Sequence, residues 1–368
     1  MSSERAVVFL LTSLAGAGSQ RKTVNLVNAL VPAGHRVHLC YLDRKEDLLC
    51  ALRPAPNLRI ECLDRRGRID RAAMERFAGI LRAYAGGTLF AVNPYPVFFA
   101  TRSMGGLRAR YRLVAATNTY TFSDRKEAVL FHLFQKRAYR RADLVLFGSL
   151  AQRDLWCSEY AIDPERSAVI YNGVDLDRFS PDATRPERAA GDGGAVRLVM
   201  IASFTPHKRH VDLLEAMRIV LAQGQEVTAT LVGQGALRAS LEQRVEGCEL
   251  AGRVGFTGFA EDVRPHLRSA DVAVLPSSSV ETFSNAILES MAMGLPVLAS
   301  DIGGAAEQIT HGVDGLLFEP GNVEELAACI RSMCDPRRRA EAGRAARRTA
   351  VERFGLERMV DAYRKIIA

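Results

Sequence analysis

Residues 271–322 read DVAVLPSSSVETFSNAILESMAMGLPVLASDIGGAAEQITHGVDGLLFEPGN, and this stretch decides the fold. Short apolar strands alternate in it with helices and with loops rich in small residues, which is typical of a doubly wound α/β sheet. We expect a strand over residues 271–275 and a helix over about 285–293, with Ser284 or Asn285 as its N-cap. The helix is apolar nearly all round, so it should be packed on several sides.

One charged residue, Glu289, stands inside this apolar helix. A buried carboxylate is costly unless it has partners. Asn285 lies four residues earlier and shares its helix face, one turn below a helix start whose unpaired N–H groups form an anion site. A diphosphate there would place its ribose near Glu289 and the group beyond the phosphates near Glu281, which suits a nucleotide-sugar. The plainer alternative is that both acids only complement the helix dipole.

The same acids carry a resemblance to a known family. They lie in the pattern P-S-x-x-x-E-T-F-S-N-x-x-L-E-x-M-A-x-G-x-P-V, with seven residues between Glu281 and Glu289. This resembles the E-x7-E signature of retaining glycosyltransferases of family 4, also called group 1, in the GT-B class. The resemblance extends over most of the chain and implies two Rossmann-like doubly wound domains facing across a cleft. It also implies transfer of a sugar from a nucleotide-sugar with retention of anomeric configuration.

The bulk composition agrees with a two-domain enzyme. The chain has 368 residues and is 48% hydrophobic, enough for two cores of ordinary size. No apolar run of about 18 residues occurs, so no membrane span is expected. The first residues superficially resemble a signal peptide, but Glu4 stands in its charged region and we interpret the apolar part as a strand. Seven cysteines without paired spacing indicate reduced thiols in a cytoplasmic enzyme rather than disulfides or a zinc site.

Positive charge is concentrated in the first half of the chain. Residues 1–180 contain 27 Lys and Arg against 17 Asp and Glu, whereas residues 181–368 contain 22 against 25. Such a basic half indicates an anionic partner. No nucleic-acid module is recognisable, so no nucleic acid is expected. A lipid-linked or glycan acceptor and a peripheral contact with an anionic membrane, at its inner face, fit better.

The first domain opens with an apolar strand, the glycines Gly16 and Gly18, and a helix over about 21–31. This arrangement begins a doubly wound domain, but the dinucleotide motif lacks its third glycine. Asp43, after the second strand, leaves a nicotinamide-dependent oxidoreductase open as an alternative. By resemblance, the glycine loop closes over the donor phosphates. Many members end a later strand of this domain with an acceptor-side histidine, where this chain has Thr117 or Asn118.

In the second half, Lys208 resembles the family lysine that meets the donor diphosphate. A cation suits this role because two phosphates need positive charge in a cleft. The arginine that members place six residues earlier is Ala202 here, and Arg209 is the candidate substitute. The resemblance places the loop of Gly258 and Phe259 beside the base.

The resemblance assigns catalytic roles to Glu281, Lys208 and Asn118. It assigns donor binding to Gly16, Gly18, Ser203, Lys208, Arg209, Gly258, Phe259, Glu281, Phe283, Ser284, Asn285 and Glu289. No cofactor or metal is expected, because Asp175-Leu176-Asp177 follows a turn instead of a strand end and no other acidic cluster has ligand spacing. Family frequency favours a UDP-sugar as donor, for a hexosyl transfer in cell-surface polysaccharide or glycoconjugate synthesis.

The expected domains are an acceptor-side domain over residues 1–180, a linker over 181–195, a donor-binding domain over 196–352 and a C-terminal helix over 353–368 that crosses back. The segment over 128–141 mixes apolar and basic residues. It is either a core helix with a wet basic end or a membrane-surface helix, and the first is the commoner arrangement. Three rival functions remain open: the oxidoreductase, a sugar-nucleotide epimerase of the same fold, and a non-catalytic binding module.

Overall fold

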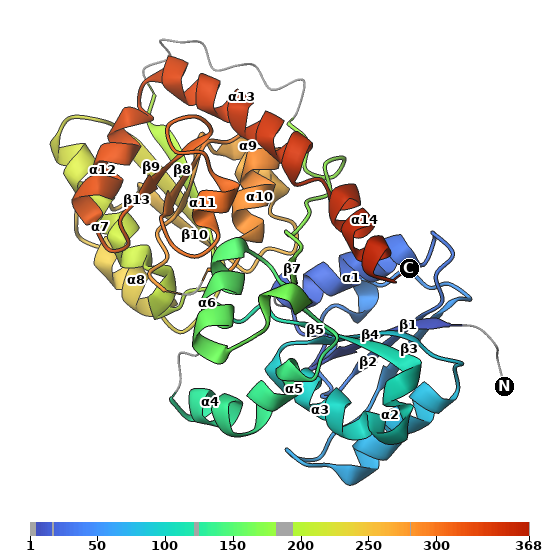
Figure 1. Ribbon diagram of the computed structural model, residues 1–368. Coiled ribbons are helices and arrows are strands. Elements are labelled where there is room, and N and C mark those ends of the chain that lie inside the picture. Colours follow the sequence, from blue (N-terminus) through green and yellow to red (C-terminus); the bar gives the residue numbers. More distant parts are fainter. Residues whose placement is uncertain (1–4, 17, 121–124, 182–193, 280, 368) are drawn as a thin grey trace. The chain divides into compact units, whose positions relative to one another are not determined.

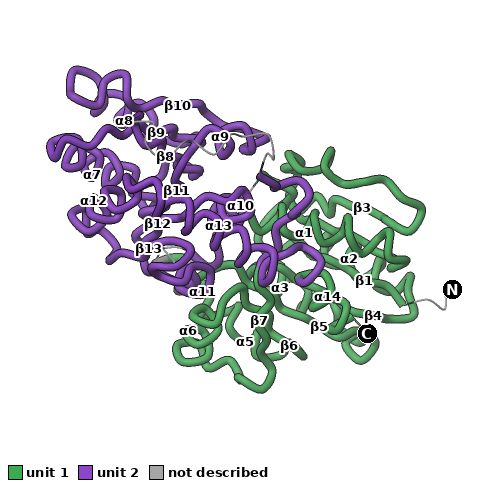
Figure 2. The backbone as a smooth tube through the Cα atoms, turned by 90° about the horizontal axis from the view of Figure 1, so that it is seen from above, with its two compact units in different colours: residues 1–171, 359–368 green, residues 172–358 purple. Residues whose placement is uncertain are grey.

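The computed structural model describes residues 5–16, 18–120, 125–181, 194–279 and 281–367. The chain divides into two compact units, residues 1–171 with 359–368 and residues 172–358 (Figure 2). The predicted linker over 181–195 lies almost entirely outside the described residues. Each unit is built on one parallel sheet, which confirms the predicted pair of Rossmann-like doubly wound domains.

The sheet of the first unit has seven parallel strands in the order β3-β2-β1-β4-β5-β6-β7. Strand β1, in the interior of this sheet, is buried along its whole length, as expected when both faces of a parallel sheet are covered. In the register, Val7 pairs with Val37 on one side and with Thr88 on the other. The strands are β1 (Ala6–Leu11), β2 (Val37–Tyr41), β3 (Leu58–Cys62), β4 (Gly87–Val92), β5 (Tyr111–Ala116), β6 (Leu144–Phe147) and β7 (Ser167–Val169).

Helices cover both faces of this sheet (Figure 1). They are α1 (Gly18–Leu30), α2 (Arg71–Arg82), α3 (Pro94–Met104), α4 (Arg125–Leu130), α5 (Lys136–Arg140), α6 (Leu150–Tyr160) and the part of α14 (Leu356–Ile367) from Met359 onward. On the face of α1 and α14, Phe9 stacks on Phe90, with ring centroids 5.1 Å apart, and Phe90 contacts Tyr363. Val8 and Leu89 point to the other face, into a core shared with α2, α3, α5 and α6.

The second unit has a six-stranded parallel sheet in the order β10-β9-β8-β11-β12-β13. Its strands are β8 (Val196–Ile201), β9 (Val227–Val232), β10 (Val254–Gly258), β11 (Val272–Leu275), β12 (Val297–Ser300) and β13 (Gly315–Phe318). Its helices are α7 (His210–Ala222), α8 (Arg238–Val245), α9 (Arg264–Ser269), α10 (Asn285–Ala292), α11 (Ala305–Gln308), α12 (Val323–Ser332) and α13 (Pro336–Arg353). Leu214, Met217 and Ile330 pack α7 and α12 on one face, and α9, α10 and α13 lie on the other (Figure 1). The strand and the helix expected in the decisive stretch are β11 and α10.

Both sheets have the same switch point. In each unit the first strand lies beside the fourth, β1 beside β4 and β8 beside β11, so chain connections leave in opposite directions on its two sides. Doubly wound sheets bind ligands at the carboxyl ends of the strands next to such a point. The topology therefore predicts a binding site at the loops after β1 and β4 in the first unit and after β8 and β11 in the second.

The segment from α4 to α5 corrects one interpretation. It is helical, with a π-helical turn (Phe131–Gln135) between the two helices. Phe131 is buried, but Val129, Leu133 and Phe134 are 55%, 60% and 55% exposed. The interpretation as a core helix with a solvated basic end therefore holds only for the side of this segment that carries Phe131. Among the described residues, no helix is both long and apolar enough to cross a membrane.

We predict that Asp271→Asn destabilises the second unit. The carboxylate of Asp271 is 6% exposed and accepts from Arg197 Nε at 2.9 Å, from Nη2 at 2.7 Å and from the Arg197 backbone N–H at 3.0 Å. Loss of these charge-assisted bonds should lower the free energy of unfolding by about 2 kcal/mol. The measurement is urea unfolding followed by circular dichroism. As a control, Glu242→Gln breaks a half-exposed pair with Arg238 and should lose less than about 1 kcal/mol; equal losses in both variants would contradict the prediction.

Candidate functional site

An ion pair joins the loops that follow β8 and β11, the two strands at the switch point of the second sheet. Lys208 Nζ pairs with Glu281 Oε1, and the two side chains are only 16% and 12% exposed. Ser277 Oγ donates to the same carboxylate oxygen at 3.0 Å. Both described partners of Glu281 thus use Oε1, and no hydrogen bond or ion pair joins Oε2 to another described residue. This oxygen can accept a hydrogen bond from a bound molecule.

Two histidines flank Lys208 without adding charge. The Ser278 backbone N–H donates to His207 O at 2.9 Å, which fastens the two loops together. Burial and then the Lys208 charge lower the pKa of His207, with Glu281 opposing. The same two causes lower the pKa of His210 to about 4. Both imidazoles are therefore neutral at pH 7, and Lys208 supplies the positive charge of this loop.

Arg209, the candidate second cation, is engaged by its own helix. Its Nε and Nη2 lie 2.9 and 2.8 Å from the carboxylate oxygens of Asp212, whose side chain is 4% exposed. This pair fixes the start of α7. Ser203 is exposed in the same loop.

Two glycines let the loop after β9 lie directly against the loop after β8. A Cβ on Gly233 would meet Ala202 O at 2.0 Å, and a Cβ on Gly235 would meet Phe204 O at 2.4 Å. The Gly233 N–H donates to Gly258 O at 2.8 Å, which brings in the loop after β10. The side chain of Phe259, next in that loop, is 58% exposed. The loops after β8, β9 and β10 thus form one continuous edge, with Phe259 available to stack on a planar ligand.

The start of α10 is braced from outside but not capped by its own side chain. Ser284 occupies the N-cap position and makes no capping hydrogen bond. Its N–H and carbonyl instead form a pair of 2.9 Å bonds with the amide of Gln308. Asn172 Nδ2 donates to Phe283 O at 2.9 Å and to Asn285 Oδ1 at 3.0 Å. The helix start is therefore held in place while its first N–H groups lack a side-chain cap, as an anion site requires.

Glu289 lies one turn further along α10 and is half-buried. It follows Asn285 by four residues in a helix that is continuous over both, so the two share a face, as the sequence predicts. The second unit therefore brings together Ser203, Lys208, Gly258, Phe259, Glu281, Phe283, Ser284, Asn285 and Glu289 along the carboxyl edge of one sheet.

Gly16, Gly18 and Asn118 belong to the first unit. The Gly16 N–H donates to Asp47 Oδ2 at 3.1 Å, and Gly18 begins α1. Asn118 follows β5, and its backbone N–H donates to Asn93 Oδ1 at 3.0 Å. Asn93 itself has φ of 77°, a strained value for a residue that is not glycine. These residues mark the carboxyl edge of the first sheet.

A small pocket at this edge is lined by Asn118 and by Lys22, a lysine that no motif in the sequence singles out. Lys22 of α1 and Tyr363 of α14 line it together with Asn118. Lys22 Nζ donates to Ile170 O at 3.3 Å and lies 5.8 Å from the Tyr363 ring centroid. Burial lowers the pKa of Lys22 to about 8. Its signal in the sequence is weak, because α1 begins with the polar residues GSQRKT; only the spacing of four residues to the buried Leu26 places Lys22 on a buried face of the helix.

The acids that a dinucleotide site and a D-x-D metal site would require already have hydrogen-bond partners within the fold. Asp43, the candidate ribose acid of a dinucleotide site, forms a bidentate pair with Arg65 at 2.9 and 2.8 Å. Asp175 Oδ1 accepts from the backbone N–H groups of Asp177 and Arg178, so the D-x-D sequence is a turn. Within the described residues, no group of three His, Cys, Asp or Glu side chains is placed to hold a metal ion.

Comparison with known families and proteins agrees with this geometry. Residues 16–178 match the family described as Glycosyltransferase Family 4, and residues 195–335 match Glycosyl transferases group 1. The GDP-mannose-dependent alpha-(1-6)-phosphatidylinositol monomannoside mannosyltransferase of Mycobacterium tuberculosis is 30% identical over 268 residues, 68% of this chain and 69% of that protein.

Other similar proteins differ in named substrate. The D-inositol 3-phosphate glycosyltransferase of Geodermatophilus obscurus is 34% identical over 252 residues, 65% of this chain. The matched chain spans only 55% of that relative's length. The solved structure of Anabaena HepE in complex with UDP is 21% identical, with a TM-score of 0.84 over 98% of this chain and 99% of that one, and has the same fold.

We predict that Lys22→Met changes stability in a pH-dependent way. The folded-state pKa of Lys22, about 8, is below its ordinary value of 10.5, so the folded chain binds fewer protons than the unfolded chain between these values. The contribution of Lys22 to stability therefore rises with pH over that interval and is least favourable below it. In thermal unfolding, the midpoint temperature of Lys22→Met should exceed that of the native chain by the largest amount at pH 7 and by a smaller amount at pH 10. Lys45→Met, at an exposed lysine of the same unit, is the control; the same dependence there would exclude burial as the cause.

Proposed function

Because the chain belongs to the family 4, or group 1, glycosyltransferases, we propose that it moves a sugar from a nucleotide-sugar to an acceptor with retention of anomeric configuration. The observation that carries the proposal is the Lys208–Glu281 pair at the switch point, whose acid lies four residues before Asn285, the first residue of α10. Such a pair offers one group for phosphate and one for sugar at neighbouring positions.

The donor diphosphate binds at Lys208 and the first N–H groups of α10. Lys208 supplies a full positive charge, and the helix start adds backbone donors and the positive end of its dipole. In the chain without donor, Glu281 neutralises Lys208. A diphosphate that binds here therefore competes with Glu281 for the Lys208 ammonium. Either the Lys208–Glu281 ion pair separates, or the ammonium contacts both the carboxylate and the phosphate.

The sugar lies beside Glu281 and the ribose beside Glu289. Ser277 and Lys208 hold Glu281 Oε1, which orients the carboxylate and leaves Oε2 to accept from sugar hydroxyls. Glu289 is one turn beyond Asn285 in α10, about 5.4 Å along the helix axis, and the proposal places the ribose there. Phe259 stacks on the base.

Catalysis rests on stabilising the leaving phosphate. Negative charge grows on the diphosphate as its bond to the sugar breaks, and Lys208 with the helix start stabilises that charge most when it is largest. The leaving phosphate takes the acceptor proton on the same face of the sugar, so Asn118 orients the acceptor and is not required as a base. Lys208 and the helix together provide the charge that a metal would otherwise supply, so the proposed reaction needs none.

The proposed donor is a UDP-hexose, and the proposed acceptor is a glycan, glycolipid or lipid-linked sugar. Anabaena HepE was solved with UDP, whereas the M. tuberculosis relative is named for GDP-mannose, so the base needs a direct test. Mass spectrometry of nucleotide-sugar that copurifies with the chain identifies base and sugar together. Consumption of the donor without any acceptor would favour the epimerase alternative.

We predict that two variants separate the sugar from the nucleotide. Glu281→Gln should lower transfer by roughly 100-fold or more, yet leave the affinity for free UDP or GDP equal or higher, because Lys208 loses its internal counterion. Glu289→Ala should weaken that affinity by about tenfold, since a charged hydrogen bond to ribose is lost. Isothermal titration with both nucleotides and a transfer assay at saturating donor measure the two effects. Glu341→Gln, at an exposed acid of α13, is the control; parallel losses in both properties for both variants would defeat this division of roles.

The exposed side of α4 and α5 supports peripheral binding to an anionic membrane, where a lipid-linked acceptor would be found. Val129, Leu133 and Phe134 are more than half exposed, and Lys126, Arg137 and Arg140 are exposed near them in the same segment. Apolar side chains that enter the lipid boundary, flanked by cations that attract anionic head groups, are typical of interfacial helices.

We predict that Leu133→Ser with Phe134→Ser reduces sedimentation with phosphatidylglycerol vesicles severalfold, because both apolar contacts with lipid are lost. The matched control is Ile69→Ser, which removes a 68% exposed apolar side chain elsewhere in the same unit and should leave sedimentation unchanged. The measurement is cosedimentation at low and high salt. Equal binding by the native chain and the double variant would reject the membrane surface.

A further inference from the structure

A large hollow lies at the amino ends of the strands of the first sheet. It has a volume of about 960 Å³ and is lined by the first residues of β1, β4 and β5, by the turn before β2 and by the end of α14. In a parallel sheet the amino edge is opposite the carboxyl edge, where Gly16 and Asn118 lie. This amino-edge pocket is therefore separate from Gly16, from Asn118 and from the small pocket beside Asn118, which lie at the other edge of the same sheet.

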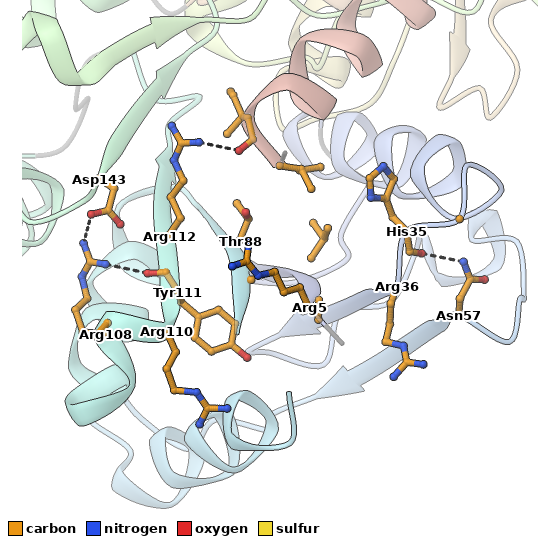
Figure 3. Close-up of a pocket in the computed structure, with 17 residues that line it drawn as sticks. Arg5, His35, Arg36, Asn57, Thr88, Arg108, Arg110, Tyr111, Arg112 and Asp143 are labelled. Atoms are coloured by element: carbon orange, nitrogen blue, oxygen red, sulfur yellow. Dashed lines mark hydrogen bonds and ion pairs between the residues drawn. The ribbon is translucent and has the colours of Figure 1, made fainter. Parts of the chain in front are cut away.

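Five arginines line the amino-edge pocket: Arg5, Arg36, Arg108, Arg110 and Arg112. Figure 3 shows Arg5 crossing the middle of the hollow, with Arg110 and Arg112 on one side and Arg36 on the other. Asp143 is the one acid among the lining residues that the structure describes. The lining thus has a surplus of four positive charges when His35 is neutral, and burial and then Arg364 lower the pKa of His35.

The one carboxylate is already neutralised within the fold. Asp143 pairs with Arg108 at 2.7 Å and also accepts from the Leu113 N–H at 2.7 Å. Arg108 further donates to Tyr111 O and Arg141 O, at 3.0 Å each. Arg108 and Asp143 therefore form a structural unit in the wall, and the remaining arginines account for the surplus charge.

Three of these arginines have no carboxylate partner in the described part of the chain. Arg110 donates to the backbone carbonyls of Tyr84 and Ala85. Arg112 donates to Ile366 O at 2.8 Å, in the last turn of α14 (Figure 3). Neither a hydrogen bond nor an ion pair links Arg5 to any other described residue. The carbonyl contacts fix the directions of two guanidinium groups without cancelling their charge, so a positive potential remains concentrated in the hollow.

We propose that the amino-edge pocket binds a soluble multivalent phosphate, a molecule with two or more linked phosphate groups such as a nucleoside triphosphate. The planar guanidinium fork matches phosphate oxygens in pairs, and several forks around one space require several charges in the ligand. The volume is within the range of small-molecule sites and is too large for a single phosphate. Binding there does not depend on sugar transfer, and it would brace the end of α14 through Arg112.

The test is isothermal titration of the full chain with sodium tripolyphosphate. Arg5→Gln removes the guanidinium that no described residue holds, so the fold should be kept, and the affinity should fall about tenfold. Arg5→Lys keeps the positive charge but loses the planar guanidinium group, so its affinity for tripolyphosphate should fall less than that of Arg5→Gln. The control Arg71→Gln removes an exposed arginine from α2 of the same unit and should change nothing.

Two further measurements separate this site from the others. Tripolyphosphate binding should persist in Lys208→Ala and in the presence of saturating UDP; if Lys208→Ala abolishes it and Arg5→Gln does not, the phosphates sit in the donor loops and the proposal is wrong. Absence of binding to the native chain would also overturn it. Sedimentation with phosphatidic acid vesicles that requires Arg5, without tripolyphosphate binding, would assign the pocket to a lipid head group and overturn the soluble ligand.

Discussion

The proposed chemistry depends on a mostly buried ammonium and carboxylate that form an ion pair. Lys208 and Glu281 are both more than four-fifths buried, and neither could remain charged there alone without a large desolvation penalty. Pairing removes that penalty in the chain without ligand. Since a donor would supply a diphosphate for the lysine and hydroxyls for the acid, the pair can be exchanged for two new contacts without leaving a buried charge unsatisfied. In the proposed reaction, donor affinity would therefore be the difference between two states in which both charges have partners.

This exchange requires that both loops stay in place while partners change. The switch point between β8 and β11 sets the two loops beside each other, and the bond from Ser278 to His207 O fastens them. Asn172 and Gln308 fix the backbone around the start of α10 from two sides. Reactive groups on loops that a rigid sheet positions are a common division of labour. Burial and the Lys208 charge also lower the pKa of both neighbouring histidines, and Asp212 pairs with Arg209, so Lys208 is the cation of this loop that faces Glu281.

Local signals in the sequence were sufficient to predict the helices and strands, but they could not predict which side chains contact each other. β11 and α10 lie within a residue of their expected bounds, because an apolar run ended by proline and a helix begun at a small polar residue are complete within a few positions. The contact between Lys208 and Glu281 spans 73 residues, and only the topology of the sheet creates it. Arg209 is different: its partner Asp212 is three residues away, so helical spacing alone could have shown that this guanidinium was occupied. The exposure of Leu133 and Phe134 could not be read from periodicity, because the π-helical turn shifts which residues face the core.

The structure shows where the surplus of basic residues in the first half of the sequence lies. Some arginines are structural, as Arg108 is with Asp143 and Arg65 with Asp43, and their charge is cancelled inside the fold. Others collect at two places, the exposed side of the segment from α4 to α5 and the amino edge of the sheet. At the first, cations surround exposed apolar side chains, which suits an extended anionic surface. At the second, they enclose a hollow, which suits a compact anion. A surplus of positive charge therefore favours a different kind of anion at each place, and the shape of the surface around the basic side chains determines which kind.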